Sequence, residues 1–125
     1  IYVYNTSGTR LSHIHIKNNE VFDIWTKSGE DPGTTLNNYK RWAALHVRTD
    51  DSPGSSFDDV LIENNIVRDM GGTGIATTGE LTTTTTDYMT NVVVRANEVF
   101  NGRADGVIIR SSLAPLIEYN YVHHN

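Results

Sequence analysis

Two carboxylates, Asp50 and Glu80, occupy matching places in the sequence, each two residues beyond a short strand-like segment that ends at Arg48 or Thr78. If the two segments lie side by side in one sheet, the backbones of Asp50 and Glu80 are about 5 Å apart. Carboxyl groups that close can form the nucleophile and acid/base pair of a retaining glycosidase, because one must be protonated while the other stays ionised. Together with Asp51 they can equally hold Ca²⁺, which prefers carboxylate and carbonyl oxygens. The plainer alternative is a pair of solvated loop acids.

Basic side chains are expected near these acids. His46 is predicted to face outward between Tyr2 and Ala76, where it can relay protons or hydrogen-bond a sugar hydroxyl; as a lone histidine it can also be an ordinary surface residue. Arg48 and Arg110 are predicted two coils apart, about 10 Å, which is comparable to the spacing of consecutive sugars. A guanidinium binds a carboxylate through two hydrogen bonds, so a uronate is a suitable ligand. The alternative is that both arginines pair with local acids.

Aromatic side chains complete the candidate site. Tyr4 and Trp42 flank the same wall and loop, where their rings can stack on pyranose rings, although Trp42 can instead anchor the loop. Asp105 is either a further polar contact for the sugar or a local partner of an arginine. The predicted catalytic residues are Asp50, Glu80 and His46, and the predicted substrate-binding residues are Arg48, Arg110, Tyr4, Trp42 and Asp105.

These residues can only meet if the chain folds as a repeat, and a repeated phrase is present. An apolar-x-apolar-x-x-Asn-x-Val pattern occurs at residues 14–21, 60–67 and 92–99, and a degenerate copy occupies residues 115–122. The shortest spacing, from Asn97 to Asn120, is interpreted as the basic coil, and the longer spacings contain loops. Such repeats predict a solenoid in which each unit buries its apolar face by stacking on its neighbours.

A second strand-like segment follows the phrase in three copies, at residues 44–48, 74–78 and 106–110. Alternation places Ile16, Ile62, Val94 and Ile117 in one inward column and Leu45, Ile75 and Val107 in another. The outward column beside the first contains Lys17, Glu63, Arg95 and Glu118, so neighbouring coils carry opposite charges. Asn19, Asn65, Asn97 and Asn120 are predicted to form a structural amide ladder at a turn that requires left-handed backbone angles.

Parallel strands, short turns, an Asn ladder and a following Val resemble the right-handed parallel β-helix of the pectate-lyase-like superfamily. The phrase at residues 117–125 is similar to coils of secreted bacterial β-helix proteins. The resemblance implies an all-β fold of about three to four coils, with loops inserted near residues 26–42, 49–59 and 79–90. It also implies a surface for a long carbohydrate and a place outside the cell or on its surface, with lyases, hydrolases and esterases all represented. Because the aspartate-rich metal cluster of the lyases has no residue-by-residue match, a glycoside hydrolase is favoured over a polysaccharide lyase.

Composition limits the partners. The formal net charge of −5 opposes a nucleic-acid groove, which needs clustered Lys and Arg, and no apolar run suits a membrane span. No cofactor is expected to be required, with Ca²⁺ as the one ion considered. Both ends fall within a coil, so residues 1–125 are predicted to be a single β-helix segment whose partners are a polysaccharide and the remaining coils of a longer chain. The competing function is a β-helix without catalysis, which binds glycan or serves as an adhesion or fibre segment.

Overall fold

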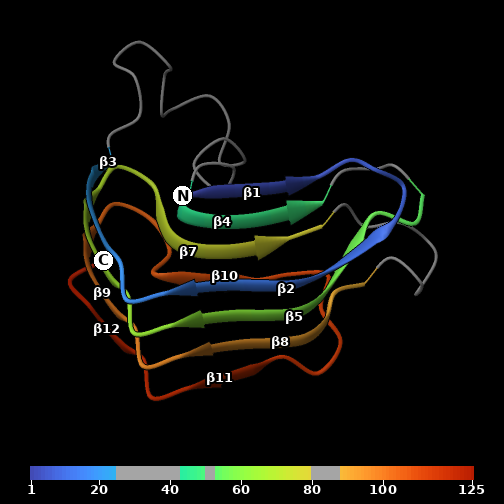
Figure 1. Ribbon diagram of the computed structural model, residues 1–125. Helices are drawn as coiled ribbons and strands as arrows, with labels where there is room; N and C mark the ends of the chain where they lie inside the picture. The colour runs from blue at the N-terminus through green and yellow to red at the C-terminus, as the bar shows by residue number, and fades with distance from the viewer. Residues whose placement is uncertain (25–42, 50–52, 80–87) are drawn as a thin grey trace, which may run out of the picture.

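The chain forms a stack of parallel strands in three sheets. The structure is a computed structural model that describes residues 1–24, 43–49, 53–79 and 88–125 (Figure 1). Sheet A contains β1 (Tyr2–Asn5), β4 (Ala43–Thr49), β7 (Thr73–Thr78) and β10 (Val107–Ile109). Sheet B contains β2 (Arg10–Lys17), β5 (Ser56–Glu63), β8 (Thr90–Arg95) and β11 (Leu116–Glu118). Sheet C contains β3 (Glu20–Ile24), β6 (Ile66–Met70), β9 (Glu98–Gly102) and β12 (Tyr121–His123).

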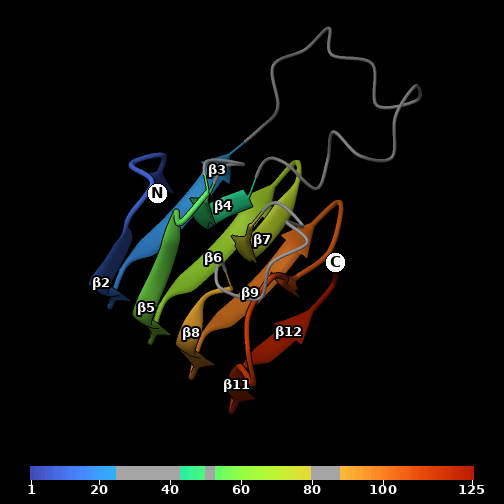
Figure 2. The same ribbon diagram turned by 90° about the vertical axis from the view of Figure 1, so that its right-hand side faces the viewer.

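Each coil passes through sheet B, then C, then A, and every pairing between coils is parallel. Figure 2 shows the strands of sheets B and C stacked in chain order. The predicted parallel β-helix of about four coils is therefore confirmed. The strands of sheet C were not predicted. They are short and follow the ladder Asn so closely that their sequence was interpreted as a turn. Within the described ranges, no helix is long and apolar enough to cross a bilayer.

The inward columns form the core as predicted. Ile16, Ile62, Val94 and Ile117 are in register across sheet B, and Leu45, Ile75 and Val107 are in register across sheet A. Ile62, Val94, Leu45 and Ile75 have no exposed surface, whereas Ile117 is 50% exposed. Ile117 differs because β11 is an edge strand with a neighbour on one side only.

The Asn ladder is confirmed. The Nδ2 groups of Asn19, Asn65 and Asn97 each donate to the Oδ1 of the next ladder residue, at 2.9–3.0 Å, as far as Asn120. The left-handed residue is not the ladder Asn, however, but the one before it, namely Asn18, Asn64, Ala96 and Tyr119. The corner therefore uses two residues, one for the bend and one for the amide hydrogen bonds.

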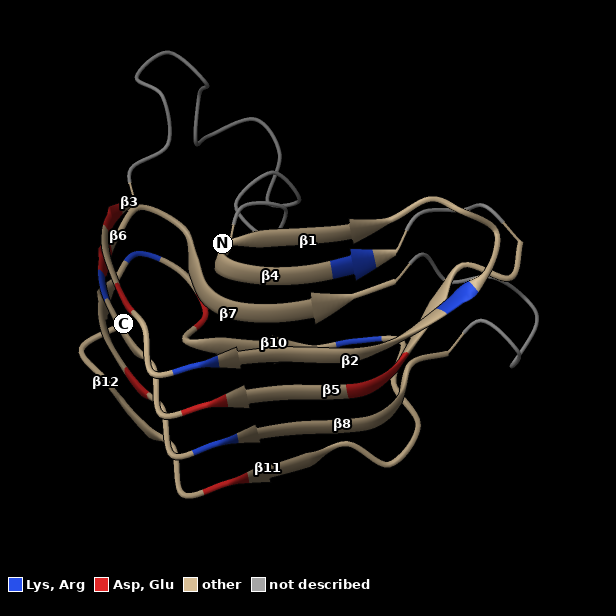
Figure 3. Cartoon of the chain, viewed as in Figure 1, with Lys and Arg blue, Asp and Glu red and all other residues tan. Residues whose placement is uncertain are grey.

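Positive and negative residues alternate from coil to coil at the carboxyl-terminal ends of the strands of sheet B, also as predicted (Figure 3). The Glu63 carboxylate lies 3.3 Å from Lys17 Nζ and 2.6 Å from the Arg95 guanidinium. These contacts join three successive coils. The hydrogen bond from Arg95 is the main reason that the pKa of Glu63 lies below its usual value.

The second predicted loop is shorter than expected. Residues 56–59, which were assigned to the loop at 49–59, belong to β5. Asp59 has a left-handed backbone (φ 55°), and this bend breaks the alternation: Phe57 and Val60 both point into the core although they are three residues apart. A search for period-two alternation therefore starts the strand too late.

Candidate functional site

The residues predicted to bind a ligand lie on the outer wall of sheet A, defined here as Tyr2, Tyr4, His46, Arg48, Thr78 and Arg110. The register pairs Tyr2 with His46 and Tyr4 with Arg48, which pairs in turn with Thr78. Arg110 directly follows β10 and its amide donates to the carbonyl of Thr77. Strand pairing therefore places Tyr4, Arg48, Thr78 and Arg110 in one column across four coils, as the sequence predicted.

Two exposed tyrosines begin this wall. The rings of Tyr2 and Tyr4 are stacked, with centroids 5.6 Å apart and planes at 21°. They are 56% and 45% exposed. Arg48 Cζ lies 5.6 Å from the centroid of the Tyr4 ring, so the guanidinium faces the ring as a cation–π pair. The arrangement places an apolar platform next to a fixed positive charge.

Arg110 supplies a second positive charge. Its side chain is exposed and forms no ion pair with any residue in the described part of the chain. Arg48 and Arg110 are separated by two strand spacings, about 10 Å at the backbone, with Thr78 between them. Arg110 forms no ion pair with Asp105, one of the local acids considered as an alternative partner: Asp105 precedes β10 whereas Arg110 follows it.

His46 is in the predicted register but not in the predicted environment. It faces outward as predicted, but it is only 2% exposed, so it is not an ordinary surface residue. The ring centroids of Tyr2 and His46 are 5.3 Å apart, and the Nε2 atom of His46 lies 2.7 Å from Thr78 Oγ1. Residues on both faces of β4 and β7 are buried, so an outward direction on these strands does not bring solvent exposure. In this position His46 contacts Tyr2 and Thr78, and its predicted catalytic role stays a prediction.

The predicted acids Asp50, Asp51 and Glu80, and also Trp42, lie outside the described residues. The residues just before two of them are close together, because a Cβ built on Gly79 would approach Thr49 Oγ1 to 2.8 Å. Ser111 of the next coil donates from Oγ to the Gly79 carbonyl at 2.9 Å. Asp50 and Glu80 therefore follow backbone positions that are neighbours in adjacent coils. Their convergence, and a calcium ion held by them, stay predictions.

A second aromatic surface was missed because sheet C was not predicted. Phe22, Arg68, Phe100 and His123 form one outward column. Arg68 Cζ lies 4.5 Å from the Phe22 ring centroid, and the Phe100 and His123 rings stack at 5.0 Å. Here the cation is already neutralised, since the Arg68 guanidinium contacts Glu20 at 2.8 Å and Asp69 at 2.6 Å.

Comparison with known proteins supports the architecture. The sequence profile of the family described as the right-handed β-helix region matches residues 1–125. No curated protein and no solved structure gives a significant match.

Proposed function

We propose a function for this chain, which belongs to the right-handed β-helix family. It is a segment of an extracellular carbohydrate-active protein, and it binds an acidic polysaccharide along the outer wall of sheet A. The observation that carries the proposal is the column of Tyr4, Arg48, Thr78 and Arg110, in which two guanidinium groups flank a hydroxyl beside an exposed ring.

The chemistry of this column suits a uronate polymer. Each guanidinium can donate two parallel hydrogen bonds to a carboxylate, and the hydroxyl of Thr78 can bond a ring hydroxyl. The stacked tyrosines offer an apolar surface to the face of a pyranose. Because the chain has a net charge of −5, overall attraction does not favour a polyanion, and binding must depend on these local cations.

The outer face of sheet C fits the same ligand less well. Its Arg68 already has two carboxylate partners, and the hydrogen bonds from that guanidinium would have to be exchanged for those of the sugar. Arg110 on sheet A makes no such ion pair with a described residue. The gain on binding an acidic sugar is therefore larger at Arg110 than at Arg68.

Hydrolysis of the bound chain is a second candidate function. It is favoured by the contact of Thr49 with Gly79, because the next residue in each segment is a carboxylic acid, Asp50 or Glu80. One acid would attack the sugar while the other protonates the leaving oxygen, as in retaining glycosidases. The burial of His46 argues for binding without a histidine in the chemistry.

Calorimetry with a uronate oligomer, such as oligogalacturonate, tests the proposal. The dissociation constants of Arg110→Ala and Arg48→Ala are compared with that of the unmodified protein. A lost charge-assisted contact is worth about 1.5–3 kcal/mol, so the dissociation constant should rise roughly 10- to 150-fold. Arg95→Ala is the matched control, since Arg95 lies on sheet B and binds Glu63. Equal affinities in all three variants would remove the site from sheet A.

Release of reducing ends from the same polymer tests hydrolysis separately. If the chain hydrolyses the polymer, Glu80→Gln and Asp50→Asn should abolish product formation while leaving affinity nearly unchanged. Binding without any product in the unmodified protein would leave the non-catalytic glycan-binding function. Unsaturated products that require Ca²⁺ would instead indicate a lyase.

A further inference from the structure

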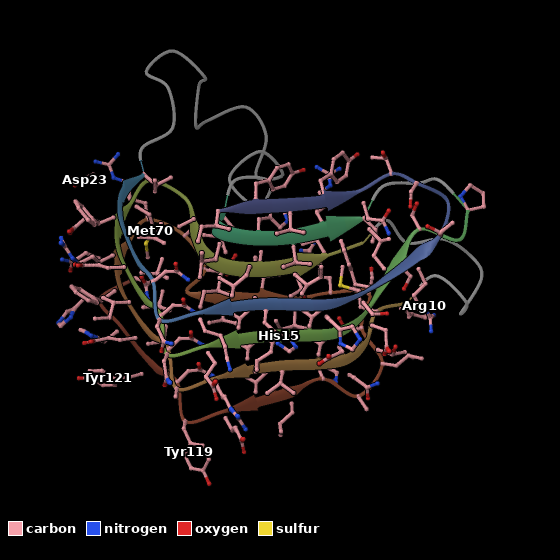
Figure 4. The ribbon with its side chains drawn as sticks, in the orientation of Figure 1. Arg10, His15, Asp23, Met70, Tyr119 and Tyr121 are labelled. Carbon is pink, nitrogen blue, oxygen red and sulfur yellow. The ribbon has the colours of Figure 1, made fainter. Side chains whose placement is uncertain are left out.

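Two histidines and an aspartate meet on the outer face of sheet B, away from the wall of sheet A. His13 Nδ1 lies 2.7 Å from Asp59 Oδ2, and His15 Nε2 lies 3.1 Å from the same oxygen. One ligand atom from each residue can be chosen so that all three lie within 4.8 Å of one another. Figure 4 labels His15 on this face, over the strands β2 and β5.

The backbone explains this convergence. His13 (φ 61°) and Asp59 (φ 55°) are left-handed residues at equivalent places in β2 and β5, between the register pairs Ser12 with Asp58 and Ile14 with Val60. Both side chains therefore leave the sheet at one bend, in adjacent coils. His15 lies two residues further along β2 and projects from the same face. Its ring is perpendicular to that of His13, at 89°, so that different ring nitrogens reach the one carboxylate.

The neighbouring acid does not compete for the histidines. Asp58 accepts hydrogen bonds from Thr90 Oγ1 at 2.6 Å and from Asn91 Nδ2 at 2.8 Å. Asp59 instead accepts hydrogen bonds from His13 and His15. The cluster therefore offers one carboxylate and two imidazoles.

We propose that His13, His15 and Asp59 form a binding site for a divalent transition-metal ion, for which Zn²⁺ is the probe. Two imidazole nitrogens and one carboxylate oxygen are a donor set that Zn²⁺ accepts and that the oxygen-seeking Ca²⁺ and Mg²⁺ do not favour. Ligands at about 2.0–2.2 Å from a tetrahedral ion are roughly 3.3 Å apart, so small side-chain rotations suffice. A metal ion would take the place of the protons that now link the imidazoles to Asp59, and each neutral imidazole would then carry its proton on its other ring nitrogen.

The site leaves room for a fourth ligand. The side chains of His13, His15 and Asp59 are 79%, 43% and 40% exposed, so water reaches the ion position. Because the ligands come from β2 and β5, the ion would join two coils and stabilise their pairing. This role does not depend on the wall of sheet A, and the two proposals can fail independently.

The sequence contained a signal for this site. A His-x-His pair at residues 13 and 15 places two imidazoles on one face of a strand. None of the three residues was predicted as a ligand, and Asp59 was assigned to a loop, whereas it belongs to β5.

Calorimetric titration of the tag-free full chain with Zn²⁺ tests the proposal. The Nδ1 atoms of His123 and His124 also lie 2.7 Å apart, on another face, and could bind Zn²⁺ themselves. Substitutions are therefore made in a background protein that carries His123→Gln and His124→Asn. His13→Asn, His15→Ala and Asp59→Asn should each weaken Zn²⁺ binding by about tenfold or more. Asparagine is chosen at position 13 because it tolerates the left-handed backbone.

Asp58→Asn is the matched control, with the same chemical change one residue away, and it should keep the affinity of the background protein. Zn²⁺ should also raise the melting temperature of the background and of Asp58→Asn, but not of Asp59→Asn. Circular dichroism without metal establishes that each variant is folded. The proposal is wrong if Asp59→Asn and Asp58→Asn bind Zn²⁺ equally, if the background does not bind Zn²⁺, or if Ca²⁺ displaces it at equal concentration.

Discussion

Replacement of Asn97, an interior residue of the ladder, should be among the most damaging single changes in this chain. Asn97 is 1% exposed. Its Nδ2 donates to the carbonyls of Ile62 and Arg95, both at 3.0 Å, and to Asn120 Oδ1 at 2.9 Å. Its Oδ1 accepts from the backbone and side-chain amides of Asn65, at 3.0 and 2.9 Å.

The expected magnitude follows from these contacts. The two Nδ2 hydrogens and the two bonds accepted by Oδ1 amount to four hydrogen bonds, each worth about 0.5–1.5 kcal/mol net, so Asn97→Ala should cost roughly 2–6 kcal/mol. That is a large part of an ordinary folding free energy of about 5–15 kcal/mol. Asn97→Asp should cost more, although it conserves shape, because it replaces the donor with an oxygen that faces three oxygens.

Urea unfolding followed by circular dichroism measures these free energies, with Asn19→Ala as the matched control. Asn19 occupies the end of the ladder, where its Nδ2 has two acceptors, Lys17 O and Asn65 Oδ1, and water is accessible. The loss there should be less than half of that at Asn97. Equal losses at the two positions, or an Asp variant as stable as the Ala variant, would refute the ladder as a source of stability.

Three further outcomes are expected. The hydrogen bond and the charge of Arg95 depress the pKa of Glu63 below its ordinary value of 4.5. The ionised acid therefore stabilises the fold above that pH, and its contribution is lost as the pH falls through the depressed pKa. The urea midpoint of Glu63→Gln should fall less on acidification than that of the parent. Thr77→Val should stabilise the chain by about 1 kcal/mol in thermal melts, since the buried Thr77 hydroxyl has no hydrogen-bond partner among the described residues; a lower melting temperature would contradict this. Gly74→Ala should lower the melting temperature, because an added Cβ would lie 2.6 Å from the Gly106 carbonyl oxygen and cost about 1–3 kcal/mol; an unchanged melt would show that the coils can separate there.

The stacking of the coils could be predicted from the sequence because it depends on columns. Ile16, Ile62 and Val94 repeat at one place in a recurring phrase, and the opposite charges of Lys17, Glu63 and Arg95 occur one position later. Parallel pairing in register turns such repetition into contact. In this part of the chain, the position of a residue within the repeat therefore predicts which residues of the neighbouring coils it contacts.

The candidate site could be predicted only in part. Register placed Arg48 beside Tyr4 and His46 beside Tyr2, and both pairs were found. The burial of His46 could not be predicted, since strand alternation tells which face a residue occupies but not what covers that face.

The late start predicted for β5 and the missed cluster at Asp59 share one physical cause, which is the left-handed residue. Such residues at His13, Asp59 and Asp69 bend strands without ending them. They shift the alternation, so β5 appeared to start too late and the Asp59 cluster was not recognised.

The central functional claim is that an acidic glycan lies along the outer wall of sheet A, and amide chemical-shift mapping during titration with a uronate oligomer tests it most directly. The account predicts that the shifts concentrate at Tyr2, Tyr4, Arg48, Thr78 and Arg110, with little change at Phe22, Phe100 and His123 of sheet C. Shifts concentrated on sheet C, or none at millimolar oligomer, would contradict it.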